Sequence, residues 1–191
     1  MAEPKLASPN DAIARIAAIL QGTSAGPPAV VLIDGRSGAG KSTLASLILE
    51  VVPEARIIRL DNIYPGWHGL EAARDHLREK VLEPLARGQA ARWQRWDWAA
   101  HAPAEWVSVD PVAPLIVEGV GALSAQTRAL ARFAVWVDLD TALRKERALS
   151  RDGDGFAPHW DQWARDEYTF IERERPREHA DMIIDGRNIA G

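Results

Sequence analysis

The 191-residue chain contains no cysteine, which excludes disulfide bonds, cysteine-ligated zinc, iron–sulfur clusters and thiol catalysis. It also lacks any uninterrupted apolar run near the ~20 residues that a membrane-spanning helix needs. No apolar stretch follows Lys5 near the N-terminus, so we expect no signal peptide and a cytoplasmic protein.

The chain has slightly less positive than negative charge, and few lysines. Lys and Arg total 23 against 27 Asp and Glu, a net charge of −4 that disfavours binding of nucleic acid polymers through bulk charge. Only 4 of these cations are lysines, whereas tryptophan occurs 8 times. With 47% hydrophobic and 26% charged residues the composition is globular, and the length predicts one domain over residues 1–191.

Short apolar runs alternate with patterns of helical spacing along the chain. The apolar runs cover residues 29–33, 57–60, 113–117, 133–139 and 182–184. The helical patterns begin near Ser8 and then cover residues 42–52, 70–87, 141–151 and 160–174. This alternation predicts an α/β fold, a five-stranded parallel sheet with helices on both faces. We expect the strand order second, third, first, fourth, last.

Residues 35–42 read Gly-Arg-Ser-Gly-Ala-Gly-Lys-Ser and match the pattern G-x-x-x-x-G-K-[ST] in full. The match follows a predicted strand and opens a predicted helix, the context of a P-loop; the alternative is a glycine-rich turn without a ligand. Its backbone N–H groups and the helix N-terminus suit phosphate oxygens. Lys41 supplies charge to the β- and γ-phosphates, and the Ser42 hydroxyl suits Mg²⁺. The residues expected to bind ATP are Gly35, Arg36, Ser37, Gly38, Ala39, Gly40, Lys41, Ser42 and Thr43.

Two acidic residues stand where predicted strands end. Asp61 follows the second strand and Glu118 ends the third. Ligands bind at the carboxyl ends of parallel strands, so both should lie near the P-loop. One could accept the proton of an attacking hydroxyl while the other, with Ser42, orients Mg²⁺. The alternative is that each caps the helix that follows.

Three arginines share one face of a predicted helix. Arg144, Arg147 and Arg151 are spaced three and four residues apart, and the helix runs into the Gly- and Asp-rich segment 152–155. Such a face suits a lid, residues 144–158, that closes on a triphosphate and stabilises the charge in transfer. A solvated charged face is the alternative.

Together these motifs resemble the uridine kinase and phosphoribulokinase branch of the P-loop kinases. The matching stretches, within about 29–186, are 35–42, Asp-x-x-Tyr at 61–64, Glu-Gly at 118–119, Arg-x-x-Arg-x-x-x-Arg-Asp at 144–152 and Ala-Asp-Met-Ile-Ile at 180–184. The resemblance implies a P-loop NTPase fold of three layers, α/β/α, with a helical lid. It also implies that Asp61 is the general base, with Lys41 and the three arginines as catalytic partners.

Uridine kinases hold the nucleoside with a Tyr-Asp-Phe-x-x-His-x-Arg stretch, and residues 96–103 are similar. The resemblance implies a substrate-binding insertion over residues 62–110. The expected acceptor contacts are Tyr64, Trp96, Asp97, Trp98, His101 and Glu118. The alternative is that the tryptophans form a core patch beneath a β-hairpin. Pro103 replaces the family's arginine, and the family's Asp-x-Pro-x-x-Phe-Asp stretch is missing after Asp61. These departures bear on uridine as the substrate more than on kinase chemistry.

The predicted function is transfer of the γ-phosphoryl group of ATP, with Mg²⁺, to a hydroxyl of a small acceptor. A nucleoside is the first choice, and another sugar or small alcohol is the second. The alternatives are a nucleoside monophosphate or gluconate-type kinase, and a nucleotide-binding regulatory protein without an acceptor. We expect no membrane and no nucleic acid polymer as partner, and a homo-oligomer is compatible with the sequence.

Overall fold

The computed structural model describes residues 5–22 and 26–189. Its strands are β1 (Lys5–Ala7), β2 (Val30–Asp34), β3 (Arg56–Arg59), β4 (Ala91–Asp97), β5 (Ala102–Val109), β6 (Leu115–Glu118), β7 (Phe133–Asp138) and β8 (Met182–Asp185). Its helices are α1 (Pro9–Gln21), α2 (Lys41–Val51), α3 (Leu70–Leu77), α4 (Glu83–Ala86), α5 (Ala125–Arg128), α6 (Thr141–Asp152), α7 (Trp160–Glu174) and α8 (Pro176–His179). No helix in these ranges is long and apolar enough to cross a membrane.

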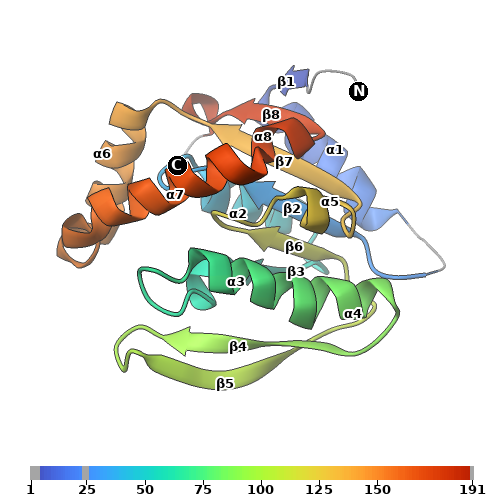
Figure 1. Ribbon diagram of the computed structural model, residues 1–191. Coiled ribbons are helices and arrows are strands. Elements are labelled where there is room, and N and C mark those ends of the chain that lie inside the picture. Colours follow the sequence, from blue (N-terminus) through green and yellow to red (C-terminus); the bar gives the residue numbers. More distant parts are fainter. Residues whose placement is uncertain (1–4, 23–25, 190–191) are drawn as a thin grey trace.

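A parallel sheet forms the centre of the molecule, with the strand order β1-β8-β7-β2-β6-β3 (Figure 1). The five predicted strands are all present, and read from β3 to β8 they have the predicted order. The sixth strand, β1, pairs with β8 at the edge. With only three residues, β1 is too short to show an alternation of apolar and polar side chains, so the sequence did not predict this strand.

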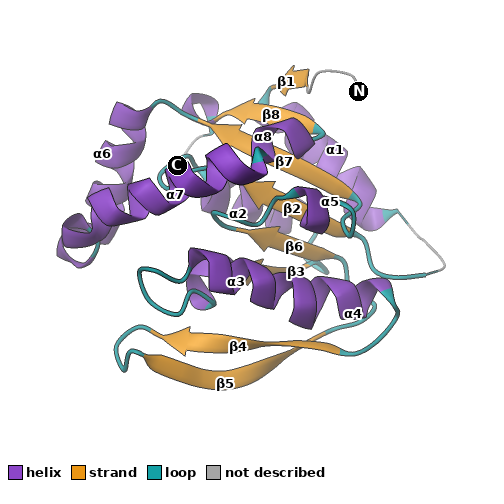
Figure 2. Ribbon diagram, viewed as in Figure 1, coloured by secondary structure: helices purple, strands orange, loops and turns teal. Residues whose placement is uncertain are grey.

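Helices cover both faces of the sheet, so the three-layer α/β/α prediction is confirmed (Figures 1 and 2). All five residues of β2 are buried. Val30 and Leu32 pack into the core beneath α3 and α7, whereas Val31 and Ile33 pack into the core beneath α1 and α2. Alternate side chains of a strand point to opposite faces, so a continuous apolar run is needed where both faces are covered.

The segment between β3 and β6 contains a long helical stretch and an antiparallel hairpin of β4 and β5. The predicted single helix over residues 70–87 is interrupted by a wide turn over 78–82. There the N–H of Glu83 donates to the carbonyl of Arg78, five residues earlier. Pro84 follows immediately and has no N–H to continue a regular helical ladder, which accounts for the wider turn.

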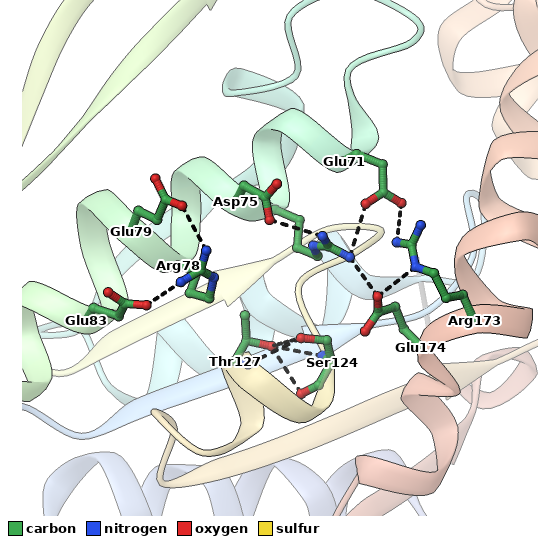
Figure 3. A network of polar contacts seen from close by, with 10 residues as sticks. Glu71, Asp75, Arg78, Glu79, Glu83, Ser124, Thr127, Arg173 and Glu174 are labelled. Carbon is green, nitrogen blue, oxygen red and sulfur yellow. Dashed lines mark hydrogen bonds and ion pairs between the residues drawn. The ribbon is translucent and has the colours of Figure 1, made fainter.

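Four charged side chains tie α3 to the C-terminal end of α7 (Figure 3). Arg74 lies 3.1 Å from Glu71 and 2.8 Å from Glu174, and Arg173 pairs with the same two carboxylates. The charges alternate around a closed ring, and the Arg74 side chain is only 14% exposed. Networks of this kind hold their members in place better than isolated surface pairs do. The ring therefore anchors one end of α7.

Candidate active site

The P-loop joins β2 to α2 as predicted, and its glycines adopt conformations that other residues rarely adopt. Gly38 has φ +81°, and a Cβ atom there would lie 2.1 Å from the backbone oxygen of Arg144. Gly40 has φ +105° and stands at the N-cap of α2, where no side chain caps the first N–H groups. The loop thus presents a helix N-terminus without a capping side chain, which fits a phosphate group.

Lys41, Ser42 and Glu118 meet at the floor of a cavity of about 620 Å³. The ammonium of Lys41 donates to the carbonyl of Arg36 at 3.2 Å. The hydroxyl of Ser42 donates to Oε1 of Glu118 at 2.9 Å, and Nε of Arg59 lies 3.4 Å from the same oxygen. Burial raises the pKa of Glu118, and the nearby Lys41 opposes that rise.

A hydroxyl and a carboxylate beside a phosphate site are a fitting donor set for Mg²⁺, which takes few protein ligands and keeps waters and phosphate oxygens. Ser42 and Glu118 supply such a pair. Among the described residues, no cluster of three or more His, Asp or Glu side chains suits a metal held by protein alone. The residues present therefore fit Mg²⁺ that is bound together with a nucleotide.

Asp34 is a buried carboxylate next to the P-loop that sequence reasoning missed. It accepts N–H bonds from Gly35 (2.6 Å), Gly121 (3.2 Å) and Leu123 (2.8 Å). Burial raises the pKa of Asp34 to about 7, although these N–H bonds and Lys41 act in the opposite direction. The residue ties the start of the P-loop to the segment after β6. An Asp at the end of a continuous apolar strand was the available signal.

Asp61 lies in a short turn directly after β3 and lines the same cavity as Lys41 and Ser42. Its carbonyl accepts the indole N–H of Trp98 at 2.8 Å. Tyr64 also lines the cavity, and its buried hydroxyl donates to the carbonyl of Val120 at 2.8 Å. The carboxyl ends of β3 and β6 thus bring Asp61 and Glu118 to the P-loop, as the parallel sheet predicts.

Two of the four predicted hairpin contacts do not line the cavity. Trp98 and His101 do, but Trp96 and Asp97 do not. The carboxylate of Asp97 turns to the hairpin itself and accepts the N–H groups of Ala99 and Ala100, each at 3.0 Å. Both bonds end on Oδ1, and they lower the pKa of Asp97.

The aromatic wall of the cavity comes mainly from residues that the sequence analysis did not select. Trp67 contacts Trp98 at 4.8 Å between ring centroids and stacks on His159 at 4.4 Å and on Phe156 at 5.3 Å. Trp163 joins them from α7. The high tryptophan content was a signal for this wall. The sequence shows which tryptophans are close along the chain, but not which of them meet in space.

The three predicted lid arginines have different surroundings. Arg144 is 1% exposed and donates to Ser37 O (3.0 Å), Leu139 O (3.1 Å) and Thr141 Oγ1 (3.2 Å). Arg147 donates to the carbonyl of Gly186 at 2.9 Å. Arg151 alone lines the cavity, where it pairs with Asp152. Of the three arginines expected on one lid face, only Arg151 lines the cavity, because the guanidinium groups of Arg144 and Arg147 donate to backbone acceptors elsewhere.

Comparison with known proteins agrees with this geometry. No family model matches the chain. A uridine kinase of Borrelia duttonii (strain Ly) is 29% identical, with 81% of this chain and 85% of that protein covered. A possible uridine kinase from Bacillus stearothermophilus superposes with a TM-score of 0.64 and 20% identity, with 92% and 98% covered. A candidate fructose transport system kinase from Silicibacter sp. TM1040 gives 0.61 and 18%, with 93% and 98% covered.

The fold is that of a P-loop kinase. The predicted resemblance to the uridine kinase branch is confirmed by the sequence of the Borrelia protein and by these folds. As in kinases of this fold, the chain carries a nucleotide-binding P-loop between β2 and α2. The relatives support a phosphotransferase, and at this identity they leave the acceptor open.

Proposed function

We propose that this P-loop kinase transfers the γ-phosphoryl group of ATP to a hydroxyl of a small acceptor, with a nucleoside as the first candidate. The observation that carries the proposal is one cavity lined by both Lys41 of the P-loop and Asp61. Phosphoryl transfer needs an acceptor hydroxyl, a base and the terminal phosphate in one place. The names of the curated relatives support a nucleoside.

Each residue has a role in this mechanism. The P-loop amides and Lys41 hold the triphosphate, and Ser42 with Glu118 would hold Mg²⁺. When bound, Mg²⁺ supplies positive charge to the phosphate oxygens. Asp61 accepts the proton of the attacking hydroxyl. The enclosing aromatic side chains position the acceptor and exclude water, which limits wasteful hydrolysis.

The proposed insertion and the proposed lid both contribute residues to the acceptor space. Trp98 and His101 come from the insertion, residues 62–110, whereas Arg151 and Phe156 come from the lid, residues 144–158. Both groups line one cavity, which supports their assignment to acceptor binding and closure. Arg151 also experiences the charges of Asp61 and Glu118, which supports a place near the transferred group.

One observation favours a smaller acceptor, a sugar or small alcohol, as the second candidate. The rings of Trp67 and His159 stack with centroids 4.4 Å apart. Aromatic rings in contact already have centroids about 4.5–7 Å apart, so no base fits between these two unless they separate. A small polyol is held mainly by hydrogen bonds and does not require a slot between two rings.

An acceptor panel tests the proposal. The wild-type protein with Mg·ATP is assayed for ADP release and for phosphorylated product with nucleosides, nucleoside monophosphates, hexoses and gluconate. We expect transfer to one of the nucleosides above background hydrolysis. Transfer to a hexose alone would select the second candidate, and transfer to a monophosphate or gluconate would select the rival kinase types. If the protein binds nucleotide but transfers phosphate to none of these acceptors, the remaining alternative is a nucleotide-binding regulatory protein.

Removal of the Trp98 indole should weaken acceptor binding. Trp98→Ala is expected to raise the KM for the acceptor by about tenfold, the usual worth of stacking on an aromatic face, with little change in the KM for ATP. Trp106→Ala is the matched control, because Trp106 lies on the same hairpin, is 43% exposed and does not line the cavity. Equal effects of the two substitutions would contradict a role of Trp98 in the acceptor site.

Arg151 and Arg144 should have separable effects although they lie seven residues apart on one helix. Arg151→Ala is expected to lower kcat by about 10²-fold, as loss of one donor to developing charge does, with an unchanged unfolding midpoint. Arg144→Ala should instead lower the free energy of unfolding by about 3 kcal/mol, because it leaves buried acceptors unpaired. Steady-state kinetics and thermal melts on both variants measure this split. If Arg151→Ala lowers the unfolding midpoint but not kcat, Arg151 has a structural role and not a catalytic one.

A further inference from the structure

Ser37 of the P-loop is held at each of its three polar groups by residues of α6 and α7. Its N–H donates to Oε1 of Glu167 at 2.8 Å, and its carbonyl accepts from Arg144 at 3.0 Å. Its hydroxyl accepts the indole N–H of Trp163 at 2.9 Å. Its N–H is therefore bonded to protein, and this part of the loop is fixed from outside by α6 and α7.

Glu167 stands at the centre of these contacts and has no role in the mechanism so far. Its side chain is 1% exposed. Oε1 accepts from Ser37 and from the indole of Trp163 (3.0 Å), while Oε2 pairs with Nε of Arg36 (3.0 Å) and lies 3.9 Å from Arg144. A buried carboxylate is costly unless it is paired and hydrogen-bonded, and these partners meet that need. Two of them belong to the P-loop.

Trp163 connects this cluster with the acceptor space. Its indole N–H reaches Ser37 and Glu167, while its ring lines the cavity and meets Tyr64 edge to face at 4.8 Å. The other end of α7 is anchored to α3 by the charge ring of Arg74 and Glu174. Trp163 is thus joined to Ser37 in two ways, directly through its indole N–H and indirectly through Glu167.

We propose that Glu167 is a positioning residue that couples the aromatic wall to the phosphate-binding loop through Trp163 and Ser37. The proposal rests on the proposed function, because it concerns the same site. Coupling between two sites is reciprocal. Nucleotide binding at the P-loop must then change the surroundings of Trp163 even without an acceptor, which makes the coupling testable before the acceptor is known.

The experiment titrates the 191-residue protein with Mg·ADP while tryptophan fluorescence is recorded, and calorimetry measures affinity in parallel. We expect a fluorescence change in the wild type that is mostly lost in Trp163→Phe. Glu167→Ala should weaken Mg·ADP binding by about 10- to 100-fold, the worth of a hydrogen bond to a charged group, and should also suppress the Trp163 signal. Glu167→Gln should recover part of both, because its amide oxygen can accept from Ser37 and Trp163. Glu172→Gln, exposed on the same helix, is the matched control and should behave as the wild type.

Failure of this inference and failure of the proposed function look different. A wild type that does not bind Mg·ADP would contradict the proposed function itself. If the wild type binds Mg·ADP and shows the same fluorescence change as Trp163→Phe, Trp163 does not respond to the nucleotide. That result would overturn the coupling and leave the proposed function standing. Wild-type affinity and signal in Glu167→Gln and Ser37→Ala together would also overturn the coupling. These two variants keep the test valid if Glu167→Ala does not fold, because Ser37→Ala removes only the hydroxyl that accepts from Trp163.

Discussion

Lys41→Ala should remove most Mg·ATP binding and lower kcat/KM by on the order of 10³-fold, with the fold retained. Among the described residues, the Lys41 ammonium has one hydrogen-bond acceptor, the carbonyl of Arg36 at 3.2 Å, and Lys41 lines the cavity. Its charge also acts on the buried carboxyls of Asp34 and Glu118, whose pKa values it lowers. Loss of that charge removes attraction for phosphate and also removes the cation that favours the ionised forms of Asp34 and Glu118.

Calorimetric titration with Mg·ATP and a thermal melt of the same sample measure this effect. Lys80→Ala is the matched control: Lys80 is another of only 4 lysines, is exposed in the turn before α4 and lies away from the cavity, so binding should be unchanged. Unchanged affinity together with unchanged turnover in Lys41→Ala would overturn the role of this P-loop. A lower melting midpoint with normal affinity would give Lys41 a structural role instead.

The sheet and the P-loop could be predicted because their signals are local. Val30 to Ile33 form a continuous apolar run, which a strand covered on both faces requires, and the glycine pattern follows at once. The place of Asp61 and Glu118 followed from a topological rule, since parallel strands end at one edge. None of these inferences depends on the packing of side chains that are far apart in the sequence.

The aromatic wall and the role of Arg144 could not be predicted, because both depend on contacts between distant segments. Helical spacing shows that Arg144 and Arg151 share a face, but not that Arg144 meets Ser37, 107 residues earlier in the chain. Likewise Trp67 meets Trp98 and Phe156, which belong to other segments of the chain. Periodicity describes one element at a time, whereas these contacts are set by how elements dock.

Asp61→Asn should lower phosphoryl transfer by roughly 10²–10⁴-fold, the usual worth of a positioned base, and leave nucleotide affinity intact. The turn after β3 places Asp61 at the cavity, and the Trp98 indole holds its carbonyl, so its backbone is fixed. Within the described residues, no hydrogen bond or ion pair engages its carboxylate, which leaves that group available to an acceptor hydroxyl. Asparagine keeps the shape and removes the basicity.

The acceptor found in the panel is used to measure this variant, with single-turnover transfer for the chemical step and calorimetry for Mg·ATP. Glu50→Gln, exposed on α2 and outside the cavity, is the control for loss of one negative charge and should transfer at the wild-type rate. If kcat falls while the KM for ATP stays constant, Asp61 acts in the transition state and not in nucleotide binding. If Asp61→Asn transfers to any acceptor at the wild-type rate, the base lies elsewhere. Glu118 is then the next candidate, because it ends a parallel strand and lines the same cavity.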